Sequence, residues 1–252
     1  GLAKIVNFSK QLGIYDDPRE LLSISLGSAE TTLLKLTSAY SSFVNGGKLI
    51  KPIMVDRIQD SEGNTILNNE KRKCINCDQL SFLSENYPKI EDNFPQIFSA
   101  ETAYQMTSIL EGVVQNGTGK KLKDLNLVLA GKTGTTNGNN DTWFIGFTSK
   151  LVIGVYVGSD NPKPLGKYET GAKTALPIFK SFVKNGVNKE DARPFKVADN
   201  ILMMVVDPVT GKKAVTQSQK TIIEAYKKLP NESNSNIDIN NRLKNNNILK
   251  FY

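Results

Sequence analysis

The sequence predicts an α/β (α+β) fold in which helices pack on an antiparallel sheet. Three apolar segments, at 125–135, 142–148 and 151–158, alternate with short polar turns, as expected for neighbouring strands of one sheet. Only Ser149-Lys150 separates the last two segments, so these strands should form an antiparallel hairpin. Apolar residues at helical spacing predict helices at 28–45, 100–115 and 177–185.

Capping signals set the expected helix boundaries. Ser28 is a candidate N-cap for the first helix, which Asn45-Gly46-Gly47 should end. The second helix should stop at Gly117; Asn116-Gly117-Thr118 also matches a glycosylation sequon, but a helix stop explains it adequately. Pro177 should open the third helix and Gly186 should close it. Its residues expected to pack on the sheet are Ile178, Phe179, Phe182 and Val183.

Residues 48–98, which we call the excursion, interrupt the regular pattern. Ser61-Glu62-Gly63-Asn64 lies between two short apolar segments and predicts a hairpin, whereas the rest of the excursion reads as irregular. Cys74-Ile-Asn-Cys77 is more consistent with a structural pair, free or disulfide-bonded, than with a catalytic one. Zinc requires about four ligands, and the sequence holds neither a second cysteine pair nor a histidine, so we expect no metal.

We divide the chain into three parts. Residues 1–186, with the excursion, should form the main unit. A small β-rich appendix at 187–229 should follow, with a strand at ILMMVVD, a turn at Pro208-Val209-Thr210-Gly211 and a return along KKAV. The polar tail at 230–252 is rich in asparagine and lysine, which is typical of disorder.

Composition narrows the classes of function. The net charge of +7 favours acidic partners such as an anionic membrane surface or a carboxylate substrate. Basic residues are scattered without an interleaved aromatic stripe, so we expect no nucleic-acid partner. The chain has no histidine, which excludes Ser-His-Asp and Cys-His sites. No apolar run approaches the ~20 residues that a membrane-spanning helix needs, and we expect no cofactor.

The most informative segment is Gly131-Lys132-Thr133-Gly134-Thr135-Thr136. Lys132 supplies a positive charge, and Thr133 and Thr135 lie two residues apart, so their hydroxyls should share a face of a strand. Gly134 has no side chain and lets another backbone approach closely. This pattern suggests a binding site for a peptide that ends in a carboxylate.

K-T-G is also a signature of penicillin-recognising serine enzymes. The stretches AGKTGTT, DTWFIGFT and LVIGVYVGSDNP, with LGSAETTLLKLTSAYSSFVNGGK and ETAYQMTSILEGVVQNGTGK upstream, resemble the transpeptidase domain of class A penicillin-binding proteins in the family's own order. The resemblance covers most of residues 1–186. It implies a penicillin-binding protein/serine β-lactamase-like sheet, here an incomplete domain that lacks its N-terminal half.

In that family, a serine of S-x-x-K attacks stem peptides ending in D-Ala-D-Ala, and an amine resolves the acyl-serine into a cross-link. The resemblance implies catalytic roles for Lys132 and Thr135, with the Thr135 N–H as an oxyanion donor. It implies substrate binding by Lys132, Thr133, Gly134, Thr135 and Thr136. Implied partners are the peptidoglycan stem peptide on its lipid-linked precursor and, for the complete domain, β-lactams. The implied location is the periplasmic face of the bacterial inner membrane, through an N-terminal anchor that is absent here.

The family's other two motifs occur only in unexpected places. S-x-x-K appears as Ser181-Phe182-Val183-Lys184, after K-T-G and inside a predicted helix. Ser84-Glu85-Asn86 matches S-x-N but falls in the excursion. We interpret both matches as accidental, so the nucleophilic serine should be absent and this chain inactive alone. The alternatives are a non-catalytic interaction module derived from the fold and a serine β-lactamase relative.

Overall fold

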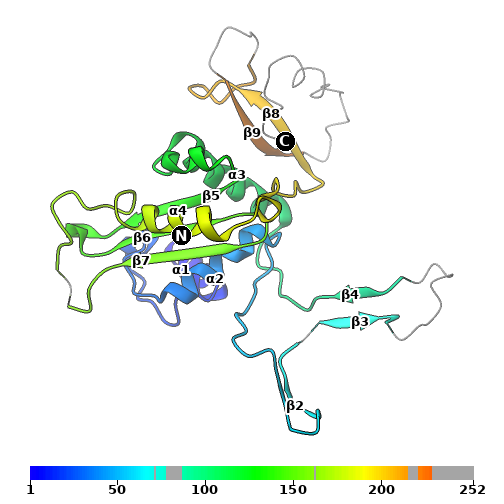
Figure 1. Ribbon diagram of the computed structural model, residues 1–252. Coiled ribbons are helices and arrows are strands. Elements are labelled where there is room, and N and C mark those ends of the chain that lie inside the picture. Colours follow the sequence, from blue (N-terminus) through cyan, green and yellow to red (C-terminus); the bar gives the residue numbers. More distant parts are fainter. Residues whose placement is uncertain (71, 78–86, 162, 215–220, 229–252) are drawn as a thin grey trace.

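The computed structural model describes residues 1–70, 72–77, 87–161, 163–214 and 221–228. Its centre is an antiparallel sheet of β5 (Ala130–Thr135), β6 (Thr142–Phe147) and β7 (Val152–Val157), in that order. Figure 1 shows α4 crossing the sheet, with α1 and α2 on the other side. The predicted three-stranded antiparallel sheet with packed helices is confirmed. We call this sheet and helices α1–α4 the body.

Two glycines in the sheet let one helix approach each face. A Cβ at Gly146 would come 2.6 Å from the ring of Phe179 in α4 (Ala175–Gly186). A Cβ at Gly154 would overlap the Thr37 hydroxyl of α2 (Leu33–Val44). Both helices therefore lie directly against the sheet backbone, which fixes the thickness of the body.

Each face of the sheet has its own apolar cluster. Phe144 of β6 and Phe179 of α4 are fully buried, with ring centroids 4.7 Å apart. The cluster around them includes Val114, Leu122, Leu129, Leu176 and Val183. On the opposite face Ala130 and Phe147 pack with Leu110, and Tyr40, Phe43 and Val44 of α2 cover them. Helices thus cover both faces of the sheet around β6.

Helix α3 (Ala100–Asn116) lies next to β5 and begins at Ser99, whose side chain accepts from the N–H of Thr102. A short helix, η2 (Lys120–Leu125), leads from α3 toward β5 and buries Leu122 completely. The strand prediction at 125–135 was therefore too long. Asn126 adopts a left-handed conformation after η2, so the strand begins only at Ala130.

The N-terminal part consists of α1 (Leu2–Gln11), η1 (Leu22–Leu26) and α2. The prediction that Ser28 caps a helix was wrong, because the Thr32 side chain accepts from the N–H of Lys35 and caps α2 instead. Asn45 is the C-cap of this helix, as expected. Helix α4 begins two residues before Pro177, and its Ile178 and Phe182 are 51% and 55% exposed rather than packed on the sheet.

The excursion extends away from the body as two exposed hairpins (Figure 1). β1 (Arg57–Gln59) pairs with β2 (Thr65–Asn68), as predicted. β3 (Lys73–Ile75) pairs with β4 (Lys89–Glu91), so this part is not wholly irregular. Cys74 and Cys77 form a disulfide with their Cα atoms 5.7 Å apart. Within the described ranges, no group of three or more cysteine and acidic side chains is placed to hold a metal ion.

After η4 (Lys189–Ala192), β8 (Ile201–Val206) pairs with β9 (Ile222–Lys227). After the turn the chain returns beside the end of β8, as predicted: Lys213 forms a bridge with Val206, and the Ala214 N–H donates to the Val205 carbonyl at 3.0 Å. The hairpin contacts α3 through the Gln105 side-chain amide, which donates to the carbonyl of Ala225 at 3.0 Å. The tail at 230–252 and the Ser84-Glu85-Asn86 match lie outside the described residues.

Candidate functional site

The candidate site lies along β5, an outer strand of the three-stranded sheet. The N–H of Thr136 donates to the carbonyl of Asp141 at 3.0 Å, toward β6. Backbone groups alternate sides along an antiparallel strand, so the N–H and carbonyl of Thr135 and of Thr133 point to the outer edge. In the described part of the chain no strand pairs with this edge, which can therefore accept an extended peptide.

Lys132 and the two threonines project to opposite faces of β5. Lys132 lies opposite Ile145 in the register and is exposed, whereas Thr133 and Thr135 lie opposite Phe144 and Thr142. The expected sharing of one face by the two threonines follows from this alternation. The Lys132 Nζ turns back to the edge and donates to the Thr133 carbonyl at 2.9 Å. Its charge therefore lies at the same edge as the outward backbone groups.

Each threonine hydroxyl has a partner from a different part of the chain. Thr133 Oγ1 lies 2.9 Å from Thr118 Oγ1, which follows α3. Thr135 Oγ1 accepts from the N–H of Gly171 at 3.1 Å. A Cβ at Gly171 would come 2.6 Å from the Gly134 carbonyl oxygen, so only glycine fits without movement. Thr118 and Gly171 lie 15 and 36 residues from their partners, and no local pattern in the sequence indicates either contact.

Asp141 stabilises the turn between β5 and β6. Its N–H donates to Thr136 Oγ1 at 2.9 Å, and its carboxylate accepts from the Tyr156 hydroxyl at 2.7 Å. This carboxylate raises the pKa of Tyr156, because it accepts a hydrogen bond from the neutral phenol. The Asp141 carboxylate thereby joins this turn to β7. In η3 (Asn137–Asn139), the Asn139 amide donates to the carbonyls of Gly166 and Lys167.

A cationic surface lies on the loop that Asn139 and Thr135 hold. The ammonium groups of Lys167 and Lys173 lie 5.5 and 5.7 Å from the ring centroid of Tyr168, which is 66% exposed. Such cation–π contacts orient the lysines while leaving their charges accessible. Together with Lys132, they place positive charge on the segments that surround β5.

Ser181 does not lie with the site residues of β5. It is exposed on α4, on the same side of the helix as the exposed Ile178 and Phe182, and α4 packs on β6 and β7. The prediction that Ser181 is helical is confirmed.

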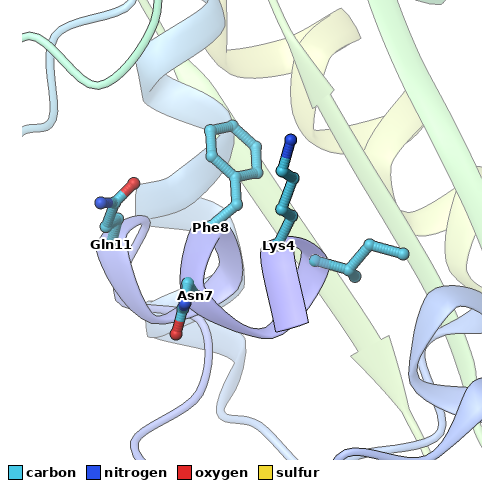
Figure 2. Close-up of a pocket in the computed structure, with 5 residues that line it drawn as sticks. Lys4, Asn7, Phe8 and Gln11 are labelled. Carbon is cyan, nitrogen blue, oxygen red and sulfur yellow. The ribbon is translucent and has the colours of Figure 1, made fainter. Parts of the chain in front are cut away.

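A shallow hollow lies on α1, away from the β5 residues (Figure 2). Ile5 and Phe8 line it with the side chains of Lys4, Asn7 and Gln11. The lining contains no carboxylate, hydroxyl or thiol and no residue of β5, so it offers no acyl-transfer chemistry. Across the described ranges, no helix combines the length and the apolar character needed to cross a bilayer.

Comparison with known proteins identifies the family. Residues 10–184 match the family described as the penicillin binding protein transpeptidase domain. Penicillin-binding protein 1A of Rickettsia prowazekii is 43% identical over 231 residues, which cover 90% of this chain and 29% of the relative. Penicillin-binding protein 1A of Pseudomonas aeruginosa is 29% identical over 259 residues, covering 90% of this chain and 31% of the relative.

The fold agrees with this assignment. The crystal structure of penicillin-binding protein 1A from Haemophilus influenzae superposes with a TM-score of 0.71 at 26% identity, covering 91% of this chain and 38% of that one. The chain spans less than a third of the length of the two curated relatives. Since the family match includes both the body and the excursion, the chain belongs to the penicillin-binding protein transpeptidase domain family.

Proposed function

We propose that this chain forms the substrate-binding part of a peptidoglycan D,D-transpeptidase site. The observation that carries the proposal is the open edge of β5, where Lys132 and the hydroxyls of Thr133 and Thr135 surround outward-pointing backbone groups. A stem peptide ending in D-Ala-D-Ala is extended and ends in a carboxylate. It would add to this edge as a strand and place its carboxylate at the two hydroxyls.

The reaction requires a serine that these residues do not place at the site. In the proposed mechanism, the serine Oγ attacks the penultimate D-Ala carbonyl and the terminal D-Ala leaves as the amine. An amine from a neighbouring stem peptide then attacks the acyl-serine and restores the hydroxyl. The outward N–H of Thr135 donates to the oxyanion in both steps, and the charge of Lys132 stabilises the anionic groups around it.

The cellular setting is part of the same proposal. The complete protein would act on lipid-linked peptidoglycan precursors at the periplasmic face of a bacterial inner membrane, where β-lactams would acylate the same serine. The matched class A relatives and the cationic segments around β5 support this setting. The proposal involves no nucleic acid, metal or cofactor.

A second candidate is a non-catalytic interaction module that kept the sheet. The exposed position of Ser181 on α4 favours it, because the in-chain S-x-x-K match then has no catalytic use. Such a module would bind peptides at β5 without forming an acyl-enzyme. A serine β-lactamase relative would instead form an acyl-enzyme that water hydrolyses rapidly.

Labelling with a fluorescent penicillin separates these functions. We expect no covalent label on this chain alone, and we expect label on the complete domain, meaning the same residues joined to an upstream S-x-x-K half. The Ser181→Ala variant should leave the complete domain's labelling unchanged. If this chain alone is labelled and Ser181→Ala abolishes the label, the assignment of the nucleophile to the upstream half is wrong. If the complete domain is not labelled, the transpeptidase proposal fails and the binding module is favoured.

A further inference from the structure

A third hydroxyl lies beside the two that we assign to carboxylate binding. Thr118 Oγ1 is exposed and lies 2.9 Å from Thr133 Oγ1. In the sequence, Asn116-Gly117-Thr118 is explained as the end of a helix, and that reading accounts for the two residues before Thr118. It gives no reason for a hydroxyl at this position. The contact with Thr133 supplies one.

The turn around Thr118 is built to hold it against β5. The N–H groups of Gly117 and Gly119 both donate to the Val113 carbonyl at 3.0 Å. A Cβ would come 2.9 Å from that carbonyl oxygen at Gly117 and 3.2 Å from it at Gly119, so the missing side chains permit this tight winding. Leu122, fully buried, anchors the segment that follows. Thr118 is therefore presented from a fixed backbone.

The direction of the hydrogen bonds follows from the chemistry of the ligand. An ionised carboxylate only accepts hydrogen bonds, and a threonine hydroxyl has one proton to donate. Thr135 Oγ1 already accepts from the Gly171 N–H, so its own proton is free to point outward. The Thr133 hydroxyl also has a single proton. It can donate this proton to the substrate carboxylate only if Thr118 is the donor in the hydrogen bond between the two threonines.

We propose that Thr118 is a positioning residue for transpeptidation: its hydroxyl donates to Thr133 Oγ1 and directs the Thr133 proton to the terminal carboxylate of the substrate. This inference rests on the proposed function, because it needs a carboxylate at the two threonines. Thr118 and the Gly171 N–H then play equivalent parts, one for each carboxylate-binding hydroxyl. Hydrogen bonds in such a chain strengthen one another.

The test uses the complete domain and measures acylation by benzylpenicillin and by its methyl ester, which lacks the carboxylate charge. Thr118→Val keeps the shape but removes the hydroxyl. It should lower the second-order acylation constant for benzylpenicillin about five- to tenfold, the loss of roughly one hydrogen bond. The decrease should lie in the binding constant of the non-covalent complex. Acylation by the ester should be unchanged.

Further variants separate an effect on the direction of the Thr133 proton from an effect on the stability of the protein. Thr118→Ser retains the hydroxyl and should acylate within about twofold of the unaltered domain, since a lone hydroxyl suffices for the donor role. Thr118→Ala is a second removal of the hydroxyl and should behave like Thr118→Val. In a Thr133→Val background, Thr118→Val should have no additional effect, because the proton it directs is already absent.

Each outcome bears on a distinct claim. If the unaltered complete domain is not labelled, the proposed function is rejected, and the role of Thr118 is rejected with it. Normal labelling with an unaffected Thr118→Val variant would reject only the positioning role. An equal slowing of benzylpenicillin and ester acylation would also reject it, since that pattern indicates a structural contribution.

Discussion

The body and the excursion belong to one matched family domain, yet they are stabilised in different ways. In the body, large side chains such as Phe144, Leu176 and Phe179 are fully buried between sheet and helices. In the excursion, Met54 is 87% and Ile66 is 69% exposed, and every strand residue of β1–β4 is exposed. The excursion depends on hairpin hydrogen bonds and the Cys74–Cys77 disulfide, whereas the body depends on burial.

The two ends of the excursion meet at the body. The Leu49 N–H donates to the Pro95 carbonyl at 3.0 Å, the Ile97 N–H donates to Gly47 at 2.9 Å, and Lys48 forms an ion pair with Asp92 at 2.9 Å. The chain therefore leaves the body and returns at one place. We therefore expect the body to close its core without the excursion, and changes in the two regions should have separable effects on stability.

The largest difference in unfolding free energy between the two regions should come from removing a buried aromatic ring in the body. Phe144→Ala creates a cavity between β6 and α4 and should lower the free energy of unfolding by about 3–5 kcal/mol. The matched change Ile66→Ala, in β2, should lower it by less than about 0.5 kcal/mol, because Ile66 is already exposed. Urea unfolding followed by tryptophan fluorescence measures both, since Trp143 lies in β6. Equal losses of unfolding free energy in Phe144→Ala and Ile66→Ala would contradict the difference between the body and the excursion.

Overpacking the same interface should have an intermediate effect. Gly146→Ala places a methyl group against the rings of Phe179 and Phe144. We expect α4 to shift and the free energy of unfolding to fall by about 1–3 kcal/mol. Gly63, at the β1–β2 turn, has a positive φ but open space around it, so Gly63→Asn provides the control in the excursion. A neutral Gly146→Ala variant would show that α4 does not pack directly on β6.

Replacing the excursion itself should have little effect on the body. A short Gly-Ser linker in place of residues 50–94 joins two points that already pair with each other. The free energy of unfolding of the body should change by less than about 1 kcal/mol, because loop length enters only logarithmically. Calorimetry and hydrogen exchange of α3 and β5–β7 measure this. A collapse of the body would show that the excursion contributes to the core.

The smallest expected effect concerns the pH dependence of stability. Burial raises the pKa of Glu111 on α3, so the folded state binds its proton more tightly than the unfolded state does. The contribution of this group to stability is therefore full below the unfolded pKa and is lost as the pH rises through the folded pKa. Glu111→Gln should raise the melting temperature at pH 7, and this gain should shrink toward pH 4.

Asp60 in the excursion has a pKa shifted in the opposite direction. Hydrogen bonds from Asn64 lower the pKa of Asp60. Its stabilising effect is present above the unfolded pKa and is lost as the pH falls through the folded pKa. Because Asp60 holds only the β1–β2 turn, Asp60→Asn should leave the melting temperature of the body unchanged at both pH values. A shift equal to that of Glu111→Gln would contradict the separation of the two regions.

The sequence predicted the strands and helix ends whose positions depend on hydrophobic periodicity and local turns. Alternation and short turns located β6 and β7, and Gly117 and Asn45 ended their helices as expected. Boundaries failed where a tertiary contact or a 3₁₀ turn decided them: η2 ends at Leu125 and Asn126 turns left-handed, so the strand predicted at 125–135 begins only at Ala130. The pairing of β8 with β9 was not predicted, because no local pattern in the sequence indicates it.

The candidate site was predictable only in its local part. The K-T-G segment itself indicates a strand with a charge and two hydroxyls. The contacts of those hydroxyls with Thr118 and the Gly171 N–H depend on how α3 and the loop before α4 lie against β5. The exposure of Phe182 depends likewise on which side of α4 faces the sheet. Such arrangements are set by packing between distant segments, which a single sequence does not reveal.

We propose that β5 carries the substrate-binding chemistry and that the excursion carries none of it. The most direct measurement is the acylation constant of three complete domains with a fluorescent penicillin: unaltered, Thr135→Val, and the Gly-Ser replacement of residues 50–94. Thr135→Val removes the hydroxyl that we propose as a carboxylate donor and should lower the constant at least about fivefold, from a loss of roughly 1–3 kcal/mol. The replacement should label at the unaltered rate. Rapid labelling of Thr135→Val, or a loss confined to the excursion replacement, would contradict the account.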